Sequence, residues 1–192
     1  MGKSSEIRYA LRMQGYLKKH GQEAAKNRIK VSWKRENDKV FIDFEAQKRL
    51  SEEWHTDPVF TDDWSKNWGL WNKDVVEVFL QLRSHDLDTK APYLELQVSP
   101  LNQPFALIIT DPRKVFYAPK DLTFSHSVKV EGRVWTAHME VVIPKDLKGK
   151  NLYGGFFSIT GHDPREFYAL GPNPEATPDF HRPELFLSLE EQ

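Results

Sequence analysis

The sequence contains no cysteine, which excludes disulfide bridges, thiolate metal sites and cysteine nucleophiles. It also lacks any apolar run of about 18 residues, the length that a membrane-spanning helix requires. The formal net charge is −1, so nothing in the composition favours a general attraction to nucleic acid or to an anionic membrane. We therefore expect neither partner. The 192 residues fit one domain, or one domain with an additional arm.

Several familiar signatures are missing as well. The sequence has no phosphate-binding loop, dinucleotide fingerprint, nucleophile elbow or His-Glu-x-x-His motif. Residues 1–20 carry basic side chains without the apolar core of a secretory signal. We therefore expect a cytoplasmic location by default, and an extracytoplasmic one if a signal has been trimmed away.

From residue 29 onward, apolar and polar residues alternate, which is typical of half-buried strands. The clearest run is 74–82, in which Val76, Val78 and Leu80 share one side of the strand. Further strands are expected at 29–34, 40–47, 92–100, 105–110, 124–131, 134–143, 152–161, 167–170 and 185–189. These nine or ten short strands, with no helical pattern between them, favour an all-β antiparallel sandwich or barrel.

Residues 1–28 are expected to form an N-terminal arm that precedes a β domain over residues 29–192. The apolar residues Ile7 and Leu11, with the pair Tyr16-Leu17, loosely fit a short amphipathic helix. Gly15 and Gly21 interrupt this pattern. An irregular first strand is therefore the alternative.

The second side of strand 74–82 is unusual because Glu77 lies between the apolar residues Val75 and Phe79. Gln81 lies on the same side of this strand, and other predicted strands carry polar residues at equivalent positions: Asp43, Glu45, Glu95, Gln97, Thr136, His138 and Glu140. If these strands are neighbours in one sheet, they form one carboxylate-rich face. Such a face is either a solvated surface or a surface for a ligand or cation. A glycoside-active enzyme that uses these carboxylates and the histidine is the less favoured hypothesis.

Two further segments carry candidate site residues. The long polar connection 47–68 is acidic, and Asp62 and Asp63, with Asp74 beyond it, could supply oxygen ligands to a structural calcium ion, although no EF-hand spacing is present. Near the end of the chain, His181 and Arg182 follow Asp179 closely. A guanidinium fork, an imidazole and a carboxylate predict a hydrogen-bonded clamp for the last loop, a ligand site, or both.

Four segments resemble, in the same order, family 9 carbohydrate-binding modules and their DOMON-like relatives. They are Gly69-Leu70-Trp71 with the strand 74–80, the run 93–100 that ends in Ser-Pro, the Trp-led strand 135–144 that ends in Ile-Pro, and the closing residues 167–170 and 178–184. The resemblance covers roughly residues 29–190.

The resemblance implies a β-sandwich of the jelly-roll type and non-catalytic binding of a sugar between aromatic rings. By this resemblance, Trp71 forms one wall of the sugar-binding slot, and Phe180 and Tyr168 are the residues available for the other wall. The hydrogen-bonding candidates are Glu77, Glu95, His181 and Arg182. It also implies that calcium ions brace the loops. The alternative is a DOMON-like domain that binds a protein partner and has no sugar affinity.

Overall fold

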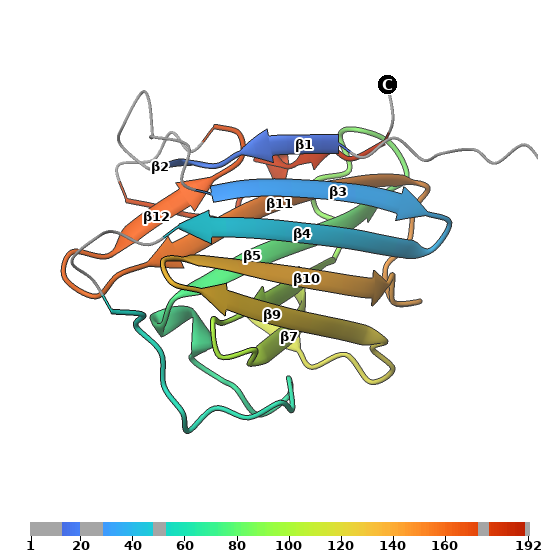
Figure 1. Cartoon of the computed structure of the whole chain (residues 1–192). Coiled ribbons are helices and arrows are strands. Elements are labelled where there is room, and N and C mark those ends of the chain that lie inside the picture. Colours follow the sequence, from blue (N-terminus) through green and yellow to red (C-terminus); the bar gives the residue numbers. More distant parts are fainter. Residues whose placement is uncertain (1–12, 20–28, 48–52, 173–176, 191–192) are drawn as a thin grey trace, which may run out of the picture.

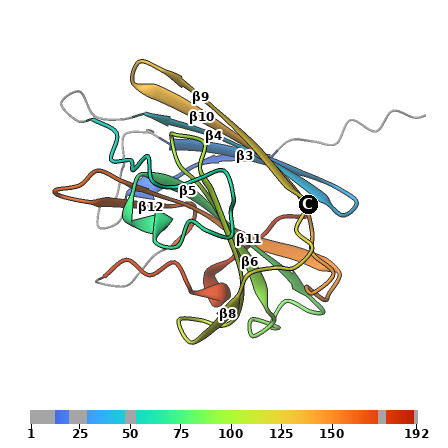
Figure 2. The same ribbon diagram turned by 90° about the horizontal axis from the view of Figure 1, so that it is seen from below.

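The computed structural model describes residues 13–19, 29–47, 53–172 and 177–190, whose strands form two packed antiparallel sheets (Figure 1). Sheet A contains, in spatial order, β1 (Met13–Tyr16), β3 (Ile29–Glu36), β4 (Lys39–Gln47), β10 (Val134–Val142) and β9 (Phe124–Glu131). Sheet B contains β2 (Lys18–Lys19), β12 (Glu166–Ala169), β11 (Asn151–Thr160), β5 (Val75–Arg83), β6 (Tyr93–Val98), β7 (Pro104–Asp111) and β8 (Val115–Tyr117), with β13 (Leu187–Ser188) also paired to β11. Figure 2 shows the two layers edge-on.

The antiparallel β-sandwich is confirmed, and every predicted strand is present. Strand β1 lies in the N-terminal segment, where an irregular first strand was the alternative, and the short strands β2 and β8 are additional. The N-terminal helix is wrong where the structure describes that segment, because β1 pairs with β3 and β2 pairs with β12. The remainder of that expectation falls on residues 1–12 and 20–28, outside the described residues. Within the described part, no helix is long and apolar enough to span a membrane.

The main core lies between the sheets. Val76, Val78 and Leu80 of β5 are fully buried there, as their alternation predicts. Across the sandwich, the rings of Trp33 in sheet A and Phe156 in sheet B lie 4.7 Å apart between centroids. Full burial of an aliphatic or aromatic side chain contributes about 1.5–3 kcal/mol, so this apolar layer is the main source of stability.

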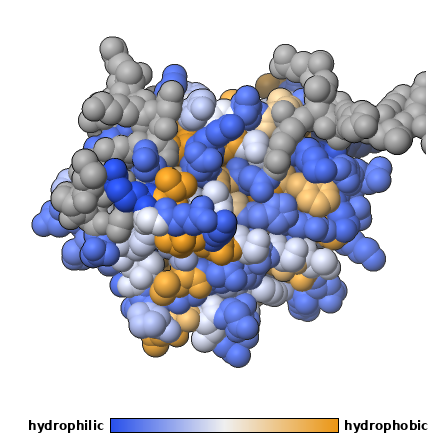
Figure 3. Space-filling view, viewed as in Figure 1, coloured by the Kyte–Doolittle hydropathy of each residue, from blue (hydrophilic) through white to orange (hydrophobic). Residues whose placement is uncertain are grey.

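The polar positions of the predicted strands lie on two outer faces rather than one. Asp43 and Glu45 in β4, with His138 in β10, are on the outer face of sheet A, which is largely hydrophilic (Figure 3). Glu77 and Glu95 are on the outer face of sheet B. The expectation of one shared carboxylate-rich face is therefore wrong, because β4 and β10 pair with each other and not with β5 and β6.

Candidate ligand-binding site

The outer face of sheet B is covered by two segments, which is why every residue of β5 is buried. The first segment, 53–74, contains the short 3-10 helix η1 (Leu70–Asn72). The second, 177–186, contains the 3-10 helix η2 (Pro183–Leu185), which lies on the side of sheet B away from sheet A (Figure 2). A second apolar cluster therefore forms on this face, around Phe79, Tyr93 and Phe157.

Sheet B and its covering segments enclose a cavity of about 380 Å³. This volume lies within the range of about 300–1,000 Å³ that is usual for small-molecule sites. Most of the lining is aromatic or aliphatic, with a few convergent polar groups. The lining residues are Trp68, Trp71, Glu77, Glu95, Gln97, Leu107, Ile109, Arg113, Phe116, Ile159, Phe167, Pro178, Asp179, Phe180 and His181.

The floor of the cavity is polar and comes from two paired strands. Glu77 of β5 stands opposite Gln97 of β6, and Glu95 follows two residues earlier on the same face. Gln97 Nε2 donates a hydrogen bond of 2.6 Å to Glu95 Oε1. Among the described residues, neither Gln97 Oε1 nor the Glu77 carboxyl has a hydrogen-bond partner. Buried polar groups are normally hydrogen-bonded, so this floor has unused capacity for a ligand.

Burial changes the acidity of the two floor carboxyls. Loss of solvation raises the pKa of Glu77 well above its usual value, and the nearby charge of Glu95 raises it further. Arg165 acts in the opposite direction on Glu77. Burial also raises the pKa of Glu95 to about 7, against a smaller opposing effect of its hydrogen bond with Gln97. The pair therefore retains a proton near neutral pH, a property that is common at functional sites.

His181 belongs both to the clamp and to the cavity. Its ring stacks on Phe79 with centroids 5.1 Å apart, and its Nδ1 lies 2.8 Å from the hydroxyl of Tyr93. Burial lowers the pKa of His181 and raises that of Tyr93, so both groups are neutral near pH 7. When Tyr93 donates to Nδ1, the imidazole proton is on Nε2, which lies 4.0 Å from Glu95 Oε2.

Aromatic side chains surround the opening. The rings of Trp68 and Trp71 meet edge to face at 4.8 Å, and Trp68 also stacks on Phe116 at 5.2 Å. Trp68 is 56 % exposed and Phe116 is 41 % exposed, so their faces are accessible from solvent. Phe180, which also lines the cavity, stacks on Phe157 at 4.3 Å.

The position of Trp71 follows from local backbone geometry and one cation. Gly69 has φ 90°, a conformation that glycine adopts without strain, and it directly precedes η1. The carbonyl oxygen of Trp71 then accepts a hydrogen bond of 2.5 Å from Arg165 Nη2. The indole is therefore fixed at the rim before any ligand binds, which limits the entropy lost on binding.

Buried polar side chains attach the 53–74 segment to the sandwich. The Asn67 amide donates to the carbonyl oxygens of Thr61 and Pro104 at 2.7 and 2.6 Å. The Asp74 carboxylate accepts from the backbone N–H groups of His55 and Gly161 at 2.9 and 2.7 Å. These contacts make the long loop a fixed wall of the cavity.

The same contacts argue against the predicted calcium site. Asp74 holds two backbone N–H groups, and Asp63 accepts from the Ser65 hydroxyl and pairs with Lys66. Over residues 13–19, 29–47, 53–172 and 177–190, no group of three or more potential ligands could hold a metal ion. Asp62, Asp63 and Asp74 are therefore not assembled into a site, because their oxygens serve local structure.

Five of the candidate residues named from the sequence line this cavity: Trp71, Glu77, Glu95, Phe180 and His181. Tyr168 does not line it, because its ring faces the core between the sheets and its hydroxyl donates to Glu166 at 2.6 Å. Its neighbour Phe167 lines the cavity instead, since successive residues of a strand face opposite sides. Arg182 also lies outside the lining, where its guanidinium pairs with Glu184 at 2.5 Å.

Sequence reasoning missed several lining residues. Leu107 faces Glu95 across the β6–β7 ladder, so strand register alone could have placed it on this face. Phe116 and Arg113 come from the additional strand β8 and the turn before it. The three-residue strand β8 has no polar alternation that would identify it, and its residues are all exposed.

Comparisons with known proteins identify a solved structure of similar fold and a relative that matches part of the chain. No protein-family model matches the chain. The mouse (Mus musculus) UPF0462 protein C4orf33 homolog is 32% identical over 125 residues, which are 61% of this chain and 60% of the relative. The chain therefore spans about 60% of that protein's length.

Among solved structures, the chain is similar to a family 9 carbohydrate-binding module from Caldicellulosiruptor kristjanssonii in complex with cellotriose. The TM-score is 0.53 at 17% identity, over 85% of this chain and 75% of the other. The chain therefore has the β-sandwich fold of a carbohydrate-binding module.

Proposed function

We propose that the chain is a non-catalytic module that binds a small carbohydrate in the cavity on the outer face of sheet B. The observation that carries this proposal is the combination of accessible aromatic rings at the rim with unpartnered hydrogen-bonding groups on a buried floor. Sugars present both a C–H face that stacks on rings and hydroxyl groups that need polar partners. The solved module with the same fold and a bound cellotriose supports the proposal.

Each part of the cavity has a role in this proposal. Trp71 provides the stacking surface on one wall, and Phe180 provides the facing wall. Glu77, Glu95 and Gln97 accept hydrogen bonds from hydroxyl groups and fix the orientation of the ring.

A glycan-array screen followed by calorimetry tests the proposal. Trp71→Ala is expected to weaken binding roughly 30-fold or more, because truncating an anchoring tryptophan costs about 2 kcal/mol or more. Phe41→Ala, on the outer face of sheet A, is the matched control and is expected to leave affinity unchanged. A wild-type protein that binds no glycan, or a Trp71→Ala variant with full affinity, contradicts the proposal.

One observation favours a second candidate, the protein-interaction domain. Strand β8 forms an edge of sheet B, and its residues Val115, Phe116 and Tyr117 are 53, 41 and 41% exposed. With Trp68 they form an exposed apolar patch, and exposed apolar patches commonly mark interfaces. If the array is blank, cross-linking of the full chain to partners should map to β8. Cross-links that map elsewhere would exclude this second candidate.

A further inference from the structure

The charges around the cavity do not balance when both floor carboxyls are ionised. Arg113 and Asp179 form an ion pair with each other across the opening. The titratable and charged groups that face the floor from the packed elements are Glu77 on β5, Glu95 on β6, Tyr93 on β6, Arg165 before β12, Arg113 before β8, and Asp179 and His181 in the 177–186 segment. Arg165, which also interacts with the buried Asp74 carboxylate, is therefore the one described cation left to oppose the two floor carboxylates, because burial keeps His181 neutral. At least one negative charge is in excess.

The floor offers unused hydrogen-bond acceptors. The Glu77 carboxyl and Gln97 Oε1 have no partner within the described ranges, while Gln97 Nε2 donates one hydrogen bond to Glu95. Arg165 Nη2 donates to the carbonyl oxygen of Trp71 rather than to the floor. A group with several donors and a positive charge complements these acceptors, and a protonated amine has both properties.

The aromatic rim fits the same chemistry. Ammonium groups are attracted to the faces of tryptophan and phenylalanine rings, and the attraction is stronger where water is excluded. Trp71 and Phe180 both line the cavity above the two glutamates. The geometry points to a ligand that carries a protonated amine and, within the proposed carbohydrate function on which this inference rests, to an amino sugar.

A measurable consequence follows from the shared proton of the floor. In the empty cavity, one proton offsets the excess charge of the buried carboxyls. An incoming ammonium group replaces that proton, so binding below neutral pH must release a proton to the buffer. Affinity for the amine therefore rises as the pH increases from 5 toward 7, as Glu95 loses its proton. A neutral sugar would release none by this route.

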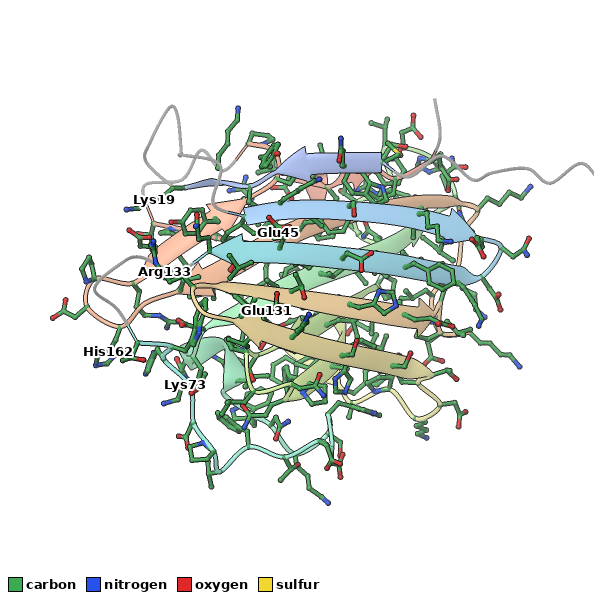
Figure 4. All side chains as sticks on the ribbon, viewed as in Figure 1. Lys19, Glu45, Lys73, Glu131, Arg133 and His162 are labelled. Atoms are coloured by element: carbon green, nitrogen blue, oxygen red, sulfur yellow. The ribbon has the colours of Figure 1, made fainter. Side chains whose placement is uncertain are left out.

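Calorimetry with glucosamine, N-acetylglucosamine and methylammonium separates the possible outcomes. Glucosamine is expected to bind roughly 10-fold or more tightly than N-acetylglucosamine, because a charge-assisted hydrogen bond is lost in the acetylated sugar. Titration at pH 6 in two buffers with different ionisation enthalpies measures the proton release. Glu77→Gln and Glu95→Gln should each reduce the preference to below roughly threefold. Glu45→Gln is the charge-matched control, since Glu45 is exposed on sheet A (Figure 4).

The outcomes distinguish this inference from the proposed function. Equal or tighter binding of N-acetylglucosamine, without proton release, overturns the amine inference and leaves carbohydrate binding intact. Binding of methylammonium but of neither sugar supports the cationic ligand and overturns the carbohydrate function. Failure of both glucosamine and methylammonium to bind overturns the inference. The buffer experiment uses the wild-type chain, so it is decisive even if a glutamine variant fails to fold.

Discussion

The strands of the two sheets have similar sequence patterns, but the outer faces of the sheets differ in their exposure to solvent. On sheet A, β4 alternates buried residues with exposed or half-buried ones, and Glu45 is exposed to water (Figure 4). On sheet B, β5 shows a comparable alternation of residue types, yet Glu77 is only 3% exposed. The difference arises from the segments 53–74 and 177–186, which cover sheet B.

This contrast shows that a covering segment, rather than the strand itself, turns a polar position into a candidate site. A carboxylate on an uncovered face remains solvated and keeps ordinary chemistry. The same residue type under a cover loses its hydration, which raises the pKa of Glu77 and Glu95.

The largest expected effect concerns the phenylalanines of the two faces. Phe79 on sheet B is 1% exposed and packs against Tyr93, Phe157 and Phe186. Phe79→Ala should therefore lower the free energy of unfolding by about 3–5 kcal/mol. Phe41 on sheet A is half-buried and its ring lies 4.6 Å from Lys34 Nζ, so Phe41→Ala should cost about 1 kcal/mol or less. Urea denaturation measures both values, and equal losses would contradict the distinction.

The next effect is the pH dependence of stability. The folded pKa of Glu95 is raised to about 7, so the folded protein binds more protons than the unfolded chain between about pH 4.5 and 7. Stability must therefore fall as pH rises through this window, by on the order of 3 kcal/mol for Glu95 alone. Glu77 acts in the same direction, because its pKa is also raised.

The matched variants locate this effect on sheet B. Glu95→Gln removes the ionisation and should flatten the stability profile above pH 5, whereas Glu45→Gln on sheet A should leave the slope unchanged. Chemical denaturation at several pH values provides the measurement. A wild-type protein that becomes more stable from pH 5 to 7.5 would show that the carboxyls are not desolvated.

The fold was largely predictable because burial between the sheets imposes period-two alternation on long strands such as β4 and β10. Strands β2 and β8 escaped prediction, and β1 was expected only as an alternative to a helix, because these strands contain two to four residues, too few to show a period. The assignment of strands to the two sheets was not predictable either, since alternation shows which residues share one side of a strand but does not show which strands are neighbours. That ambiguity produced the incorrect single polar face.

The candidate site was predictable where a residue violated its local pattern. Glu77 was identified because a carboxylate interrupts an apolar face, and Trp71 was identified through the Gly69-Leu70-Trp71 motif. Tyr168 and Arg182 were misplaced because the direction of a side chain in a short strand or an irregular loop depends on tertiary contacts, here with Glu166 and Glu184. Arg113 could not be inferred, because only the folded chain brings it to Asp179.

The smallest expected effect belongs to the contact between His138 and Asp43 on sheet A. His138 Nδ1 lies 2.8 Å from Asp43 Oδ1, and the two side chains are 44 and 34% exposed. At this exposure, water competes for the contact and salt screens any charge on it, so His138→Gln should change the free energy of unfolding by less than about 0.5 kcal/mol. Urea denaturation of the variant at low and high salt provides the measurement. A loss as large as that of Phe79→Ala would mean that sheet A also carries a desolvated polar site, and cover by the two segments would no longer explain the difference between the faces.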